Sequence, residues 1–198
     1  MPQNEQFDKD ENPYATPLSS SVESAGVSSE DSEVEELIAF AGSKADYYLK
    51  KWTPLLQGSG RGAGFNGAAF FLSGLWIAYR KMYKVTAIFF GIILLTTLAE
   101  EVLFVGILGK EETPARLDRL IGLAAAVICG VYGNRWYLGH ARKVISEVRA
   151  EGMHRDAFFD RIAKRGGTSF GSAFGMFFLF LVTTVVAVVI LEFLFHPF

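Results

Sequence analysis

Two adjacent carboxylates, Glu100 and Glu101, interrupt an apolar run that extends from residue 85 to residue 108. A helix needs about 20 apolar residues to cross a bilayer, so a span that ended at Ala99 would be too short. We therefore expect both acids to lie inside a membrane-spanning helix, where acids either move a proton, ion or substrate or make a structural polar contact. The candidate partners are Arg116, Arg119, Thr96, Thr97 and a proton.

The run from Glu100 to Leu108 also resembles the first motif of intramembrane CAAX-type prenyl proteases. That motif has an arginine at the position of Val105, and the same enzymes need histidines on other membrane helices. All three histidines of this chain lie outside its apolar stretches, so we expect no enzyme, and a protease-like enzyme stays as a further alternative. These histidines are His140, His154 and His196, and together with the single Cys129 they lack ligand spacing, which predicts no metal and no cofactor.

Four apolar stretches must position the two acids: residues 64–79, 85–108, 120–138 and 173–195. The last three are long enough to cross a bilayer as helices. The first reaches only about 24 Å at about 1.5 Å per residue. Small residues recur at four-residue steps in the third stretch, which favours close packing within the chain or a homo-oligomer. They are Gly122, Ala126 and Gly130.

The basic residues decide whether residues 64–84 cross the membrane. If this segment crosses, seven bases lie on one side and eleven on the other. If it dips in and returns, or lies flat in the interface, 15 bases fall on one side and three on the other. Cytoplasmic loops carry the excess of Lys and Arg. We therefore expect three spans and one re-entrant or interfacial segment, with the N-terminus in the cytoplasm and the C-terminus outside.

The formal net charge of −2 conceals an acidic head and a basic body. Residues 1–36 hold ten acids and one base, whereas residues 37–198 hold 18 bases and 11 acids. Residues 1–30 are polar, so we expect a disordered tail that can bind a protein partner. Residues 31–53 repeat apolar side chains at helical spacing and predict one amphipathic cytoplasmic helix. Ser32 and Glu35 fit a capping box at its start, and Pro54 ends it.

Aromatic and basic side chains gather just before the second apolar stretch. Rings at headgroup depth and cations towards anionic lipid are typical of a membrane interface, so this segment either anchors the chain or binds headgroups. The residues are Trp76, Tyr79, Arg80, Lys81, Tyr83 and Lys84. Asn134, inside the third stretch, is a further polar candidate. We expect residues 139–168 to form a helical cytoplasmic loop whose bases reflect its side of the membrane, with no nucleic acid as partner.

Four segments carry a resemblance to a known family. They are residues 45–52 (ADYYLKKW), 65–83 (FNGAAFFLSGLWIAYRKMY), 133–140 (GNRWYLGH) and 166–169 (GGTS). In these segments the chain resembles an uncharacterised family of bacterial membrane proteins, domain of unknown function 2628, from residue 37 to about residue 170. Ser73-Gly74 departs from the Gly-Pro of the family pattern. The resemblance implies a helical membrane fold and no known reaction.

We therefore expect an all-α integral membrane protein of the inner (cytoplasmic) membrane, with its membrane domain at residues 64–195. We expect a non-enzymatic interaction or envelope component whose cytoplasmic basic face meets anionic lipid headgroups. The alternative is a small oligomeric transporter or channel subunit that uses Glu100 and Glu101. Three spans are few for a transport path, so that alternative requires a homo-oligomer.

Overall fold

The computed structural model describes residues 29–58, 62–110 and 113–195, and every regular element in these ranges is helical. The elements are α1 (Ser29–Ala41), a 3-10 turn (Gly42–Lys44), α2 (Ala45–Leu56), α3 (Gly67–Leu72), α4 (Gly74–Tyr79), α5 (Tyr83–Glu101), a π-helical turn (Val102–Ile107), α6 (Ala115–Ala150), α7 (Arg155–Arg165) and α8 (Phe170–Phe195). Within the described residues the all-α prediction is confirmed. Residues 1–28 of the expected tail lie outside this description, and Ser29 and Glu30 belong to α1.

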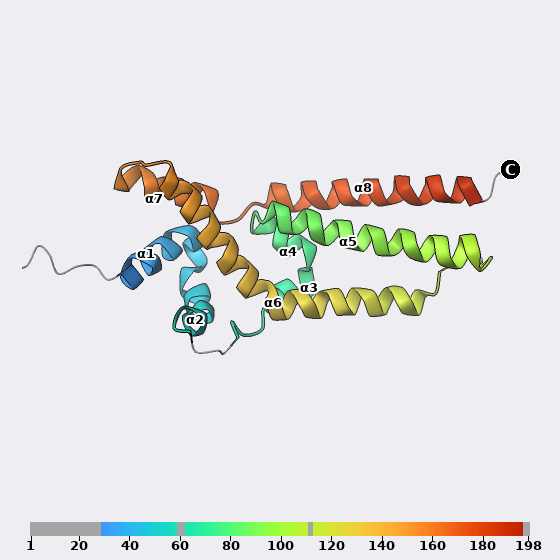
Figure 1. Ribbon diagram of the computed structural model, residues 1–198, viewed down its shortest axis with the longest axis horizontal. Helices are drawn as coiled ribbons and strands as arrows, with labels where there is room; N and C mark the ends of the chain where they lie inside the picture. Colours follow the sequence, from blue (N-terminus) through green and yellow to red (C-terminus); the bar gives the residue numbers. More distant parts are fainter. Residues whose placement is uncertain (1–28, 59–61, 111–112, 196–198) are drawn as a thin grey trace, which may run out of the picture.

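The helices form two differently packed ends. Figure 1 shows α5, α8 and one half of α6 extending in the same direction, with the short helices α3 and α4 at their base. The other half of α6 packs with α1, α2 and α7. One long helix therefore belongs to both ends of the molecule.

The segment expected to form one helix over residues 31–53 forms two, so that prediction is wrong. The 3-10 turn at Gly42–Lys44 separates α1 from α2. Gly42 has a φ of +61°, a conformation that side chains with a Cβ rarely adopt, and it lets the chain change direction. Because of this turn, Leu37 of α1 and Trp52 of α2 are both fully buried in one core.

The ends of this segment also differ from the expected ones. α1 is described from Ser29, so Ser32 lies inside the helix instead of capping it. α2 continues through Pro54 to Leu56. Proline lacks the N–H of a helical hydrogen bond, so α2 runs through Pro54 without the bond that this position would donate to the Lys50 carbonyl oxygen.

Residues 64–79 form two short helices instead of a span. α3 and α4 have six residues each and are separated at Ser73, whose φ is 42°. A six-residue helix is only about 9 Å long. α3 packs against α6, and α4 packs against α5 and α8. The segment therefore fills the base of the region between these longer helices (Figure 1).

Two helices are long and apolar enough to span a membrane: Tyr83–Ile107 and Phe170–Leu194. They correspond to the predicted spans at residues 85–108 and 173–195. The predicted span at residues 120–138 is not confirmed as a separate element. It belongs to α6, a helix of 36 residues and thus about 54 Å that continues to Ala150.

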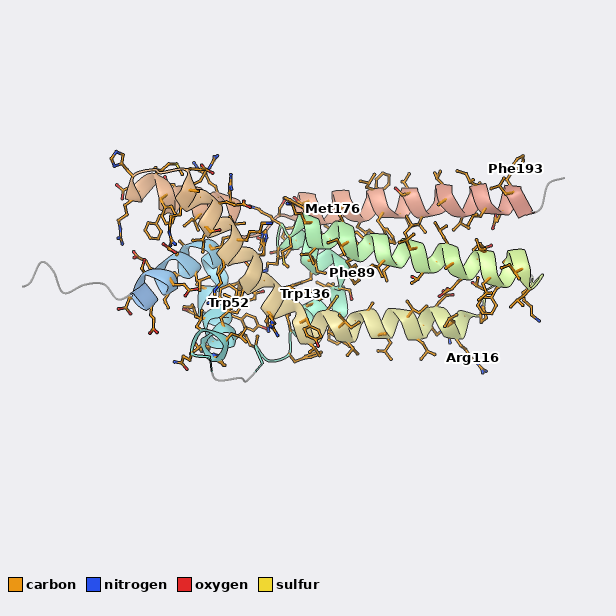
Figure 2. The ribbon with its side chains drawn as sticks, in the orientation of Figure 1. Trp52, Phe89, Arg116, Trp136, Met176 and Phe193 are labelled. Atoms are coloured by element: carbon orange, nitrogen blue, oxygen red, sulfur yellow. The ribbon has the colours of Figure 1, made fainter. Side chains whose placement is uncertain are left out.

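The core surrounds the Tyr137 ring. Its centroid lies 4.7 Å from that of Tyr48, 5.4 Å from Trp52, 5.7 Å from Phe40 and 6.2 Å from Trp76. These rings come from α1, α2, α4 and α6, so the core joins the end of the molecule that contains α1 and α2 to the base of the long apolar helices (Figure 1). Figure 2 shows Trp52 at this end, with Arg116 and Phe193 at the opposite end.

Candidate functional site

An asparagine pair joins the chain before α3 to α6. Asn66 Nδ2 donates to Asn134 Oδ1 at 2.8 Å, and Asn134 Nδ2 donates to the carbonyl oxygens of Ala63 and Gly64 at 3.0 and 3.1 Å. Asn66 Oδ1 accepts from the Ala69 amide at 3.0 Å and so caps α3. Both side chains are buried. The candidate Asn134 therefore uses its amide to hold the fold together.

The backbone of α6 near this pair receives further contacts. Trp52 Nε1 donates to the Asn134 carbonyl oxygen at 3.0 Å, and the Asn66 amide donates to the Gly130 carbonyl oxygen at 2.8 Å. A Cβ added at Gly133 would lie 2.9 Å from the Ala69 Cβ. Small residues on α6 thus let α3 approach closely, whereas a Cβ at Gly122, further along the helix, would meet nothing within 4 Å.

Arg80, one of the interface candidates, is buried among aromatic rings. Its guanidinium carbon lies 4.6 Å from the ring centroid of Tyr48, 5.1 Å from that of Tyr137 and 5.6 Å from that of Tyr79. Within the described ranges, no ion pair involves Arg80, and its Nε and Nη1 have no hydrogen-bond partner. Burial raises the pKa of Tyr48, and the Arg80 charge opposes that rise. The arrangement places the cation against ring faces instead of a carboxylate.

The other interface candidates divide between the protein interior and its surface. Trp76 is buried, and Tyr79 packs on Phe170 with ring centroids 4.8 Å apart. Lys81 Nζ donates to the carbonyl oxygens of Lys164 and Gly166 at 3.0 and 2.7 Å, which ties the start of α5 to the segment before α8.

A pocket of about 540 Å³ lies between the start of α5 and the middle of α6, and we call it the basic pocket. Its cationic lining residues are Lys81, Lys84, Arg135 and Lys143, and Tyr83, Trp136 and His140 also line it. Three of the six interface candidates therefore meet here with residues of α6.

Among the titratable groups that line this pocket, His140 is the one whose ordinary pKa lies nearest to neutral pH. Burial lowers its pKa from the ordinary 6.5; Glu147 opposes the change and Lys143 adds to it. The His140 ring also contacts that of Phe40 at a centroid distance of 5.7 Å. At neutral pH, the imidazole is therefore uncharged.

Glu100 and Glu101 end α5, just before the π-helical turn. Glu100 is buried, and its carboxyl group interacts with that of Asp118 in the first turn of α6. The group that interacts with Glu100 is thus a second acid, which is not among the partners expected for it.

The partners expected for these acids are engaged elsewhere or not paired with them. Thr96 and Thr97 both donate to the Ile93 carbonyl oxygen, at 2.7 and 3.0 Å. Neither Arg116 nor Arg119 forms an ion pair with a described acid.

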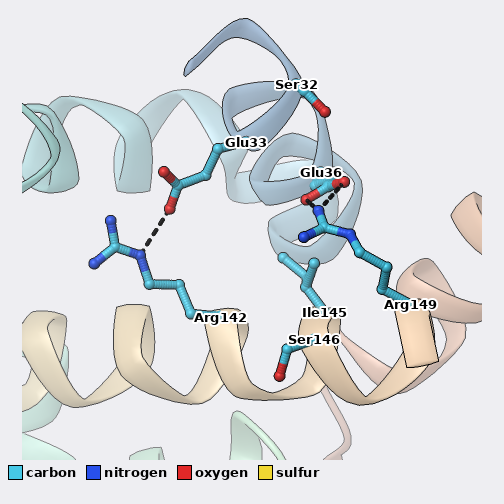
Figure 3. A pocket seen from close by; sticks show the side chains of 7 residues that line it. All are labelled: Ser32, Glu33, Glu36, Arg142, Ile145, Ser146 and Arg149. Carbon is cyan, nitrogen blue, oxygen red and sulfur yellow. Dashed lines mark hydrogen bonds and ion pairs between the residues drawn. The ribbon is translucent and has the colours of Figure 1, made fainter. Parts of the chain in front are cut away.

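Acids of α1 pair with arginines of α6 and α7. Figure 3 shows Glu33 with Arg142 and Glu36 with Arg149 across a pocket of about 520 Å³, at N–O distances of 2.7 and 2.5 Å. Glu35 pairs with Arg155 at 2.7 Å. The last acids of the acidic head are therefore part of the folded unit, where they neutralise part of the basic surface.

Side chains that could bind a metal ion do not cluster in the part of the chain that the structure describes. No group of three His, Cys, Asp or Glu side chains there could hold an ion, and Cys129 is a buried free thiol.

A family described as Protein of unknown function (DUF2628) matches residues 37–143, more than half of the chain. The chain belongs to this family. The matched part of the DUF2628 chain contains the asparagine pair, Arg80 and all four cations of the basic pocket. Residues 166–169, which contributed to the resemblance, lie outside it. No curated protein and no solved structure matches the chain.

Sequence reasoning did not single out Asn66, Arg135 or Lys143. Asn66 directly precedes an apolar segment, which is the signal of an N-cap residue. Trp136, His140 and Lys143 follow one another at steps of four and three residues, so they lie on one face of α6. That face lines the basic pocket.

Proposed function

We propose that this DUF2628 chain is an integral membrane protein in which α5 with its π-helical turn, the apolar half of α6, and α8 cross the bilayer. One observation carries the proposal. Only 11% of the most apolar window of Tyr83–Ile107 and 0% of that of Phe170–Leu194 are buried inside the protein. Helices of this length with apolar surface left uncovered require a hydrocarbon environment.

The contacts of α6 support a third span. Six residues separate Leu108 from Ala115, so α6 starts where the α5 segment ends. Its other half packs with α1, through Arg142 and Glu33, at the opposite end of the molecule. If α5 crosses the bilayer, α6 must bring the chain back across it.

The orientation follows from charge. In the three-span arrangement, 15 bases lie on the side of α1, α2 and α7, and three lie on the other side. This asymmetry favours a cytoplasmic N-terminus in the inner membrane, an outer C-terminus, and α3 and α4 as a re-entrant segment. The short lengths of α3 and α4 support the last point.

Cysteine labelling tests this arrangement. Cys129 is buried, so the native chain serves as an unlabelled background. In intact cells, a membrane-impermeant maleimide should label a Lys110→Cys variant and a Phe198→Cys variant. A Lys164→Cys variant should react only after the cells are opened. Labelling of Lys164→Cys in intact cells, or protection of Phe198→Cys, would overturn the topology.

We further propose that the protein acts by binding, as an interaction or envelope component. The buried amides of Asn66 and Asn134 make hydrogen bonds that position helices, which supports a structural role for them. The acidic tail is the proposed contact for a protein partner. A pulldown with the full chain should capture a partner that a chain lacking residues 1–28 does not, and equal capture by both would exclude the tail.

The contact between Glu100 and Asp118 favours a second candidate function, proton or ion transport by an oligomer. Transport predicts that Glu100→Gln abolishes proton uptake into proteoliposomes and that the purified chain forms a stable homo-oligomer. The matched control is Glu192→Gln, which changes an exposed acid on α8. A strict monomer with no uptake would exclude this candidate.

A further inference from the structure

Three cations of the basic pocket form no ion pair, unlike several other cations of the described chain at the same end of the molecule. Arg142, Arg149 and Arg155 each form an ion pair with an acid of α1. In the described ranges, Lys84, Arg135 and Lys143 form none. Three exposed positive charges therefore line one pocket without a carboxylate bound to them.

The same pocket has apolar and aromatic walls. Met82 and Val144 are buried, and Val85 and Trp136 are half-buried. One acid, Glu147, also lines the pocket. A site with several cations beside apolar side chains suits an amphiphile with an anionic head better than a fully soluble anion.

The position of the pocket along the helices points to the membrane surface. The apolar segment of α5 begins at Tyr83, which lines the pocket, and the apolar part of α6 ends near Leu138, between Arg135 and Gly139 of its lining. The Tyr83 hydroxyl lies 2.9 Å from Ser172 Oγ in the first turn of α8. The start of α5 and the end of the apolar part of α6 therefore line the pocket, and α8 begins beside Tyr83 at the same level.

We propose that the basic pocket binds the headgroup of an anionic phospholipid, with Lys84, Arg135 and Lys143 facing its phosphate and the apolar walls facing the first carbons of its chains. This inference rests on the proposed three-span arrangement and adds to it a defined lipid site. The ligand is a lipid of the surrounding bilayer, because the pocket lies where the apolar segments begin.

Lipid titration of the purified full-length chain tests the site. Native mass spectrometry measures the dissociation constant of the first bound dioleoyl phosphatidylglycerol and, separately, of dioleoyl phosphatidylcholine. The wild type should bind phosphatidylglycerol at least about tenfold more tightly, since each cation near a lipid surface adds severalfold. A Lys84→Gln/Arg135→Gln/Lys143→Gln variant should lose this preference.

The matched control removes three exposed cations elsewhere on the same side: Lys44→Gln/Lys50→Gln/Lys164→Gln. It should keep the preference, and so should Lys84→Arg/Lys143→Arg, which keeps the charges. Thermal unfolding and size-exclusion profiles establish that each variant is folded, and a triple variant that is unfolded is replaced by Lys84→Gln/Lys143→Gln.

Three results would overturn the proposal. They are equal binding of the two lipids by the wild type, equal loss of preference in the two triple variants, and displacement of phosphatidylglycerol by inorganic phosphate at constant ionic strength. The last result would assign the pocket to a soluble anion. The cysteine labelling tests the topology without depending on lipid binding. A wrong topology would therefore change the labelling pattern, whereas the absence of a lipid site would change only the lipid titration.

Discussion

Asn66 donates a hydrogen bond from its side-chain amide to the side-chain oxygen of Asn134 at 2.8 Å, although 68 positions separate the two residues in the sequence. Each asparagine uses its remaining groups locally. Asn66 caps α3, and Asn134 donates to two carbonyl oxygens in the segment that precedes α3. The pair therefore fixes where the chain enters the region between α6 and α8.

Asn134→Ala should lower the free energy of unfolding by about 2 kcal/mol, because the buried Asn66 amide and two carbonyl oxygens would lose their partner. Chemical unfolding in detergent, followed by tryptophan fluorescence, measures this. Ser146→Ala is the control on the same helix, since its exposed hydroxyl only bonds to Lys143 one turn away, and it should stay within about 0.5 kcal/mol of the wild type. Similar values for both variants would contradict a structural role for the pair.

Gly133→Ala should destabilise the protein, whereas Gly122→Ala should leave it unchanged or stabilise it by up to about 1 kcal/mol. A Cβ at Gly133 would lie 2.9 Å from the Ala69 Cβ, which belongs to the buried side of α3 and cannot rotate away. A Cβ at Gly122 would meet nothing within 4 Å. Thermal unfolding of the two variants side by side is the measurement, and a Gly133→Ala variant as stable as Gly122→Ala would show that α3 does not pack closely on α6.

Arg149→Met should cost more stability than Arg155→Met. Glu36, the partner of Arg149, is 5% exposed and would remain buried without its cation, at a cost of about 1 to 3 kcal/mol. Glu35, the partner of Arg155, is exposed, and such pairs contribute less than about 1 kcal/mol. Urea unfolding at low salt compares the two, and equal costs would argue against a special role for the Glu36 pair.

His140 should make stability depend on pH. Burial lowers the pKa of His140 in the folded chain below 6.5, so the unfolded chain binds more protons in the range below that value. Stability should therefore be complete above about pH 6.5 and fall as the pH drops below it. His140→Gln should flatten this profile, whereas His154→Gln, which changes an exposed side chain, should preserve it. Thermal unfolding between pH 7.5 and pH 5 gives the comparison, in which identical slopes for the wild type and His140→Gln would contradict the assignment.

The long apolar helices could be predicted from the sequence because their signal is local. A run of apolar residues has a length, and that length alone locates helices such as Phe170–Leu194. The glycine at position 42 gave no comparable signal, since an isolated glycine is tolerated within a helical pattern. Only the burial of both α1 and α2 against the same core explains why the chain turns there.

The candidate site could be predicted only in part, because its contacts are distant in sequence. The sequence Tyr79-Arg80 predicts a membrane-interface cluster. The rings that enclose the Arg80 guanidinium, however, include those of Tyr48 and Tyr137, which lie on other helices. The sequence also predicts Lys84 as a headgroup candidate, but its neighbours Arg135 and Lys143 in the basic pocket come from α6. Periodicity places a residue on a face and does not say which face lies opposite.

The unbroken course of α6 has a mechanical consequence. α6 is a single helix over Ala115–Ala150, and Figure 1 shows that it bends where it passes α3. The half that begins near Leu120 and the half that carries Val148 therefore point in different directions, yet no loop separates them. A change in the tilt of the first half, as a thicker or thinner bilayer would impose, should therefore change the orientation of the unit formed with α1, α2 and α7.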